Sequence, residues 1–123
     1  MNGKQKLHSL VEIMNSVLSK IRNYYDSEYV YYIEKDEYEI LTIYEWCMEN
    51  VPWQRDKIKL LDFEQWPKWI KQEITDTTEE SYSVQLDLEE GVTAVLAAVK
   101  VHRGGCTLEL LQAMIQMISQ TII

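Results

Sequence analysis

The sequence lacks the cysteine and histidine patterns that identify metal sites and disulfide frameworks. It contains 2 cysteines, Cys47 and Cys106, and 2 histidines, His8 and His102. None of these residues stands in a CxxC pair or has a second ligand at a zinc-site spacing, so we predict no metal and no cofactor. A disulfide between the two cysteines is disfavoured, because disulfides are rare in proteins that stay in the cytoplasm.

The sequence also lacks the signatures of catalysis and of membrane insertion. It has no glycine-rich phosphate loop and no nucleophile elbow, and its acidic runs at 34–39 and 79–80 fall in predicted turns, where solvated charge is the ordinary interpretation. No apolar run is long enough to cross a bilayer, and the opening residues MNGKQK lack the apolar core of a signal peptide. We therefore predict a protein that is not an enzyme, does not insert into membranes and resides in the cytoplasm.

Basic residues are few relative to acidic ones, with 12 Lys and Arg against 20 Asp and Glu, which gives a net charge of -8. Such a charge repels phosphate backbones, so nucleic acid is not an expected partner. The chain has 123 residues, 46% of them hydrophobic, and no repeat or low-complexity tract. That length and composition predict a single domain over 1–123 with a core of its own.

Hydrophobic periodicity predicts a mixed order of helices and strands. Three-four spacing of apolar residues indicates helices, whereas alternation and β-branched or aromatic enrichment indicate strands. The expected elements are a helix from Leu7 to Tyr25, strands at 28–34, 38–47, 81–88 and 92–101, a helix beginning at Asp62 and continuing through Ile74, and a last helix after Thr107. The predicted fold class is α+β, with a single antiparallel sheet of about four to five strands flanked by N- and C-terminal helices.

Two local features of these elements are less regular. In the strand at 38–47, alternation predicts that Ile40, Tyr44 and Trp46 share one face of the sheet. The segment 50–62 contains Pro52 and mixed charges and is expected to be a loop. Pro67 conflicts with the first turns of a helix that begins at Asp62, because proline removes a backbone hydrogen bond inside a helix.

Aromatic residues are concentrated between positions 24 and 72, a stretch that holds all 4 tryptophans and seven of the 8 tyrosines. Small-molecule pockets are mostly apolar and aromatic, which makes this stretch the candidate for a ligand site between the sheet and the following loop and helix. The candidate ligand-binding residues are Tyr44, Trp46, Trp53, Trp66 and Trp69. The alternative is that the same side chains fill the core.

The predicted terminal helices carry more apolar surface than a single sheet face needs. The last helix has two apolar stripes, and one of them has no partner within a domain of this size. We therefore expect a homodimer through the terminal helices. The candidate interface residues are Leu10, Met14, Val17, Leu110, Met114, Met117 and Ile118. The chain stops on Ile123 without a helix cap, as in a helix that continues, which suggests a fragment of a longer protein.

The segment YYDSEYVYYIEKDEYEILTIYEWCMENV, at positions 24–51, resembles the first hairpin of the GAF domains that precede diguanylate cyclase and related output domains in bacterial signalling proteins. FEQWPKWIKQ, at 63–72, is similar to the helix that follows in the same group. The resemblance implies a GAF-like sensory domain with a C-terminal output domain. Cys47 could then be a chromophore-attachment or redox site, or a buried structural thiol, which its lack of a neighbouring histidine favours.

Two functions follow from these observations. The first is a regulatory sensory module that binds a small ligand, dimerises, or does both, to control an attached output domain in bacterial signal transduction. The second is a ligand-free dimerisation or protein-interaction module.

Overall fold

The computed structural model describes residues 3–71 and 81–122, with the side chains of 3–10 and 122 left aside. The fold is α+β with one antiparallel sheet, as the sequence predicted. The sheet has four strands in the order β2-β1-β4-β3. The elements are α1 (Gly3–Tyr25), β1 (Ser27–Lys35), β2 (Ile40–Cys47), α2 (Arg55–Lys59), the 3-10 helix η1 (Phe63–Gln65), α3 (Lys68–Lys71), β3 (Tyr82–Asp87), β4 (Thr93–Val101) and α4 (Glu109–Ile122).

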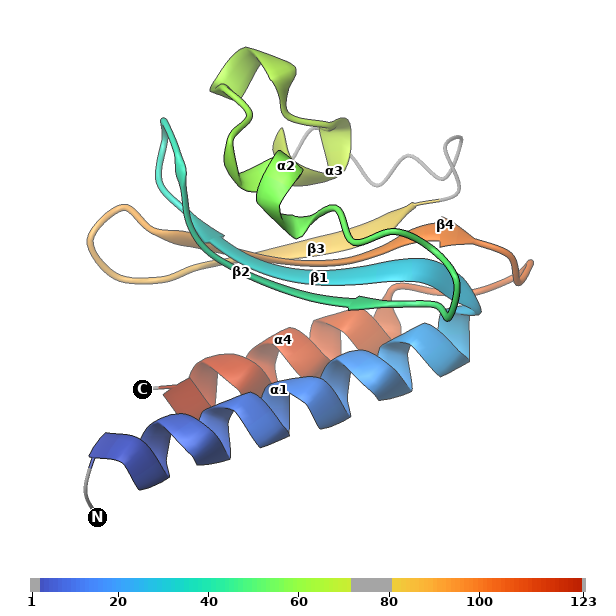
Figure 1. Cartoon of the computed structure of the whole chain (residues 1–123), viewed down its shortest axis with the longest axis horizontal. Helices are drawn as coiled ribbons and strands as arrows, with labels where there is room; N and C mark the ends of the chain where they lie inside the picture. The colour runs from blue at the N-terminus through green and yellow to red at the C-terminus, as the bar shows by residue number, and fades with distance from the viewer. Residues whose placement is uncertain (1–2, 72–80, 123) are drawn as a thin grey trace.

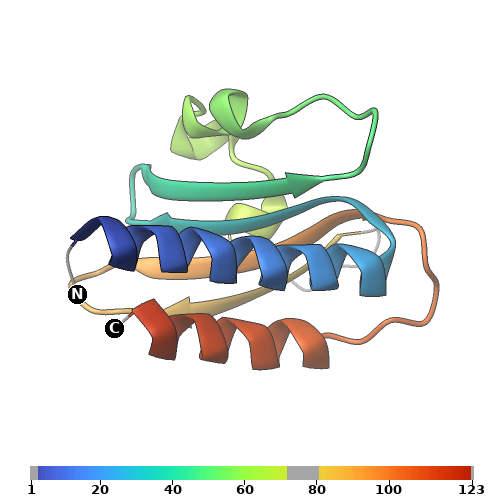
Figure 2. The same ribbon diagram turned by 60° about the horizontal axis from the view of Figure 1, so that its bottom comes forward.

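The two long terminal helices lie side by side along one face of the sheet, and the short helices lie over the other (Figures 1 and 2). We call these the helix face and the outer face. On the helix face, Leu18 and Ile21 of α1 and Leu111 of α4 are buried against Val30 and Leu96 of the sheet. The three-four spacing that predicted α1 therefore serves to pack it on the sheet.

A hydrogen bond joins the end of α1 to the beginning of α4. The Tyr25 hydroxyl donates to the Thr107 backbone carbonyl at 2.5 Å, and the Thr107 hydroxyl accepts from the backbone N–H of Glu109 at 3.4 Å. Burial of the Tyr25 ring raises the pKa of its phenol well above the usual range. The phenol therefore stays protonated and keeps its donor, which holds the two helices in register.

The outer face has a separate core. Trp66, Trp69 and Ile70, which follow β2 in the chain, are buried against Tyr31 and Val95 of the central strands. Both central strands are thus covered on both faces, which explains why their sequences are nearly continuously apolar.

A β-bulge changes the predicted orientation of one strand residue. The pairing of β1 with β2 moves from Glu34–Thr42 to Lys35–Ile40, which leaves Leu41 without an opposite residue. Beyond the bulge the side chains exchange faces. The prediction that Ile40 shares a face with Tyr44 is therefore wrong, since Ile40 is buried in the outer-face core and Tyr44 packs against the helix-face core.

The prediction of one continuous helix from Asp62 is wrong. The chain forms η1, becomes extended at Trp66 with ψ 137°, and only then enters α3 after Pro67. The cause is local, because a residue before proline avoids the helical region and proline suits a helix start. The segment 50–62, predicted as a loop, contains α2. Ile74, expected in the same helix, lies outside the described residues.

Candidate functional site

An open pocket of about 420 Å³ lies on the outer face of the sheet. Its floor is formed by β1 and β4, and its walls by the segment 51–58 and by α3. The residues that line it are Glu28, Tyr29, Tyr31, Val51, Pro52, Gln54, Ile58, Trp69, Val99 and Lys100. Its lining combines aromatic and aliphatic groups with a few polar ones, which is the usual composition of a small-molecule site.

Three aromatic rings form one side of this pocket. Tyr29 stacks on Tyr31 with ring centroids 5.8 Å apart, and Tyr31 stacks on Trp69 with centroids 5.2 Å apart; each pair is within 15° of parallel. All three side chains are buried. Neighbouring rings fix their positions, so this side of the pocket is rigid, and exposures of only 5%, 1% and 8% leave a bound molecule little ring surface to contact.

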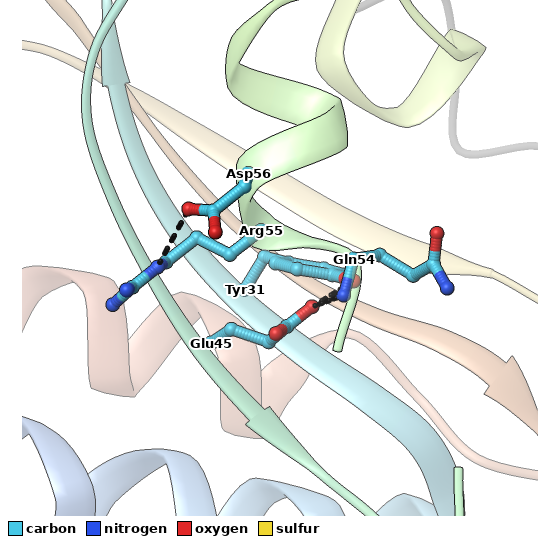
Figure 3. Close-up of polar contacts among 5 residues, drawn as sticks. All are labelled: Tyr31, Glu45, Gln54, Arg55 and Asp56. Atoms are coloured by element: carbon cyan, nitrogen blue, oxygen red, sulfur yellow. Dashed lines mark hydrogen bonds and ion pairs between the residues drawn. The ribbon is translucent and has the colours of Figure 1, made fainter. Parts of the chain in front are cut away.

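The buried carboxylate of Glu45 holds two residues that line the pocket, Tyr31 and Gln54 (Figure 3). Glu45 Oε2 accepts a hydrogen bond from the Tyr31 hydroxyl at 2.5 Å and another from the Gln54 backbone N–H at 2.9 Å. The Glu45 side chain is buried, and its Oε1 has no hydrogen-bond partner among the described residues. Burial, followed by the bond to Glu45, raises the pKa of the Tyr31 phenol far above its usual range. Tyr31 therefore remains a donor at any physiological pH.

Opposite charges lie on the pocket rim. Lys100 Nζ lies 5.9 Å from the centroid of the Tyr29 ring, and Glu28 Oε2 lies 3.1 Å from His102 Nε2. Ser27 pairs with Val101 and Tyr29 with Val99, but Glu28 and Lys100, which lie between these pairs, do not pair with each other. The Lys100 backbone has φ 59°, in the left-handed region. Such a backbone conformation costs about 1–3 kcal/mol in a non-glycine residue and is concentrated at functional sites.

The five predicted ligand-binding residues do not come together. Tyr44 and Trp46 lie on the helix face, half-buried against its core. Trp66 is buried in the outer-face core without lining the pocket, and Trp53 is 65% exposed. Trp69 does line the pocket.

Sequence reasoning did not single out Tyr29, Tyr31, Glu28 and Lys100 as site residues. The signal available for the two tyrosines was their alternate spacing, which places both on one face of β1. Nothing local to Lys100 indicates that it meets Tyr29, because the contact joins strands that are distant in the chain.

The predicted dimer residues differ in how much surface they offer. Met14, Val17 and Ile118 are buried in the helix-face core, and Leu110 and Met114 are half-buried against it. Met117 is 43% exposed. The side chain of Leu10 lies outside the described part of the chain. Homodimer formation stays a prediction, but a second copy could reach Met117 far more readily than the three core residues.

Cys47 lies next to the pocket wall. Its thiol donates to the Val51 carbonyl oxygen, with Sγ 4.0 Å from that oxygen, and the side chain is half-buried. Burial, and then the nearby Glu45 carboxylate, raise the pKa of the thiol above its ordinary value. Thiolate is the reactive form of cysteine, so this environment does not prepare Cys47 for nucleophilic or redox chemistry.

We expect Cys47 to react with iodoacetamide several-fold more slowly at pH 8 in the folded chain than in urea, because the raised pKa lowers its thiolate fraction. The rate should be measured by mass spectrometry in a Cys106→Ser variant, so that Cys47 alone reports. Raising the pH should reduce the difference in rate between the folded and the unfolded chain, since the Cys47 thiol is then ionised in both. Equal rates in folded and unfolded chains at pH 8 would contradict this account of the thiol.

Within the described ranges, no group of three or more His, Cys, Asp or Glu residues lies close enough to hold a metal ion. None of the helices described is both long and apolar enough to span a bilayer.

Comparison with known proteins gives no relative for this chain: no protein-family model, no curated protein and no solved structure matches it.

Proposed function

We propose that this chain is a regulatory module that binds a small molecule in the outer-face pocket. The observation that carries the proposal is the pocket of about 420 Å³, with a rigid aromatic side and the charged residues Glu28 and Lys100 among its lining. An apolar wall with a few polar groups at its edge provides affinity from burial and orientation from hydrogen bonds.

The charges favour a particular kind of ligand. A molecule with a flat apolar part and groups of both charge signs could place the flat part against Trp69 and Val99, and its anionic and cationic groups near Lys100 and Glu28. A purely anionic ligand would meet the net charge of -8 as well as Glu28.

The regulatory part of the proposal rests on connectivity. The pocket floor belongs to β1 and β4, and the same strands pack against α1 and α4 on the helix face. A ligand that changes the positions of these strands would act on both terminal helices, which fits a GAF-like domain with an output domain after α4. A cytoplasmic setting, in which disulfides are rare, belongs to the same proposal.

Panels of metabolites and nucleotides, titrated into the purified chain, test the proposal through tryptophan fluorescence and melting temperature. A true ligand should raise Tm by about 10 °C at about 100 times its Kd, because ligand binding to the folded state alone adds about 2.7 kcal/mol of stability. Lys100→Glu should weaken binding by about tenfold or more, since a hydrogen bond to a charged group contributes about 1.5–3 kcal/mol.

Lys20→Glu is the matched control, because Lys20 is an exposed lysine on α1, on the opposite face of the sheet from the pocket. It makes the same charge change and should leave binding intact. A ligand that binds Lys100→Glu and Lys20→Glu equally well would place the binding site elsewhere.

The second candidate function is a ligand-free dimerisation module. It is favoured by the exposed apolar side chains of the helix layer, Val11 and Ile13 on α1 and Met117 on α4, which are 38%, 37% and 43% exposed. A seam across these residues would bury apolar surface that the chain itself does not cover.

A further inference from the structure

Strand β2 forms one edge of the sheet, and nothing in the order β2-β1-β4-β3 lies beyond it (Figure 2). The Met48 backbone N–H donates to the Glu28 carbonyl at 2.8 Å, which makes 28 and 48 a hydrogen-bonded pair. In an antiparallel ladder such pairs alternate, so Thr42, Tyr44 and Trp46 direct their backbone groups toward β1.

The alternate residues of β2, which are Ile43, Glu45 and Cys47, therefore direct their backbone N–H and C=O groups away from the sheet. The hydrogen bonds recorded for the described residues include none to these backbone groups. Their geometry is that of an incomplete ladder, to which a further strand could be added.

The sequence of this edge does not discourage pairing. Edge strands are usually protected by lysine, proline, a short length, a bulge or an inward-pointing charge. Strand β2 reads ILTIYEWC over 8 residues and has neither lysine nor proline, so its protection is limited to the bulge at Leu41 and the buried Glu45. The opposite edge is shorter and more polar, since β3 reads YSVQLD over 6 residues. The two edges of the sheet thus differ in their fitness to receive a strand.

Charge indicates which strand the edge would receive. Between positions 36 and 54 the chain has five acidic residues and no basic one: Asp36, Glu37, Glu39, Glu45 and Glu49. Lys35 and Arg55 flank this segment, and Arg55 lies beside β2 (Figure 3). A second copy pairing through β2 would bring two sets of these acids together, and like charges in cross-strand contact are destabilising. A basic strand would meet attraction instead.

Glu45 offers a specific contact for such a strand. Its buried carboxylate uses Oε2 for two hydrogen bonds and leaves Oε1 without a partner among the described residues. The residue opposite Glu45 on an added antiparallel strand would lie on the same face, with its Cβ about 5 Å away. Lysine or arginine at that position has the donors that Oε1 lacks, but Oε1 is buried, so the contact requires the groups that cover it to move.

We propose that the β2 edge binds an extended, lysine- or arginine-bearing segment of a partner protein, which joins the sheet as a fifth strand. The backbone of the edge supplies the hydrogen bonds, and the acids along and beside β2 select the charge of the partner. The edge and the outer-face pocket share Glu45, which holds the pocket residues Tyr31 and Gln54, but the test of this proposal needs no ligand for that pocket.

Two synthetic peptides of about ten residues test the proposal, one alternating lysine with valine and threonine and the other carrying glutamate in place of lysine. The lysine peptide should bind at least about tenfold more tightly at low salt, because charge complementarity suppresses the wrong partner. In amide hydrogen exchange followed by NMR, it should protect the amides of Ile43, Glu45 and Cys47. The amides of Ser83 and Gln85 on the β3 edge are the internal control and should not change.

Leu41→Lys adds a charge to an exposed position on β2 and should weaken lysine-peptide binding at least about fivefold. Tyr24→Lys is the matched control, since Tyr24 is 39% exposed against 42% for Leu41 but lies on α1, outside the proposed dimer seam. Equal binding of the two peptides, protection at β3 in place of β2, or equal effects of the two variants would each overturn the proposal. So would a dimer that Leu41→Lys dissociates, since a second copy would then occupy the edge.

Discussion

Replacing Tyr31 with alanine should lower the free energy of unfolding by about 3–5 kcal/mol, the usual cost of truncating a buried aromatic residue. Tyr31 is 1% exposed and stacks against both Tyr29 and Trp69. The truncation would leave a cavity between these two rings. It would also remove the Tyr31 hydroxyl, which donates a hydrogen bond to the Glu45 carboxylate. Urea unfolding followed by tryptophan fluorescence measures the loss.

Two further variants separate packing from hydrogen bonding at this position. Tyr31→Phe keeps the ring and removes only the hydroxyl. It should cost about 1.5–3 kcal/mol, the usual contribution of a hydrogen bond to a charged group, while Glu45 Oε2 keeps its bond from the Gln54 backbone N–H. Tyr38→Ala truncates a tyrosine that is 77% exposed and should change the stability by less than about 0.5 kcal/mol. If Tyr31→Phe proved as costly as Tyr31→Ala, the hydrogen bond, and not the stacked ring, would hold the outer face together.

Glutamate at two adjacent positions of α4 should have opposite consequences. Ile118 is 1% exposed in the helix-face core, so Ile118→Glu would bury a charge without a partner and should cost at least about 3–5 kcal/mol. That is comparable to the total stability of many small domains, so the variant should be largely unfolded. Met117 is 43% exposed, and Met117→Glu should leave the fold intact.

The same pair tests the proposed dimer. Sedimentation of the wild-type chain at tens of micromolar gives the mass, and circular dichroism reports the fold. If the terminal helices form the seam, Met117→Glu should yield folded monomers. A folded, monomeric Ile118→Glu would contradict the assignment of Ile118 to the core, and an unchanged dimer in Met117→Glu would remove this residue from the seam.

The sequence was sufficient for elements whose pattern is local. The apolar spacing of α1 and the alternation of β3 predicted both elements and the antiparallel sheet, because periodicity follows directly from which face is buried. The sequence was insufficient where a single residue interrupts the hydrophobic periodicity of a helix or strand. Pro67 divides a continuous apolar stripe into η1 and α3, and the bulge at Leu41 moves Ile40 to the other face.

The candidate site was harder to predict for a different reason. Its aromatic side joins Tyr31 to Trp69, and its rim brings Lys100 over Tyr29, so each contact depends on how distant segments meet. The predicted set was chosen by residue type, which cannot separate tryptophans on opposite faces of a sheet. The apolar stripes of the terminal helices posed the same problem, since a residue packed on its own sheet and one packed on a second chain have the same spacing.

The strand order has a consequence for how the chain is made. The pairs β1–β2 and β3–β4 are hairpins that can form from neighbouring residues, but β1 also pairs with β4, which joins residues 27–35 to 93–101. Contacts between such distant segments are slow to form, because the intervening loop must close first. On the ribosome, one edge of the central strand β1 would keep its backbone N–H and C=O groups unpaired until residues 93–101 have emerged. We expect the nascent chain to be most prone to aggregation during this interval, before the second hairpin docks against the first.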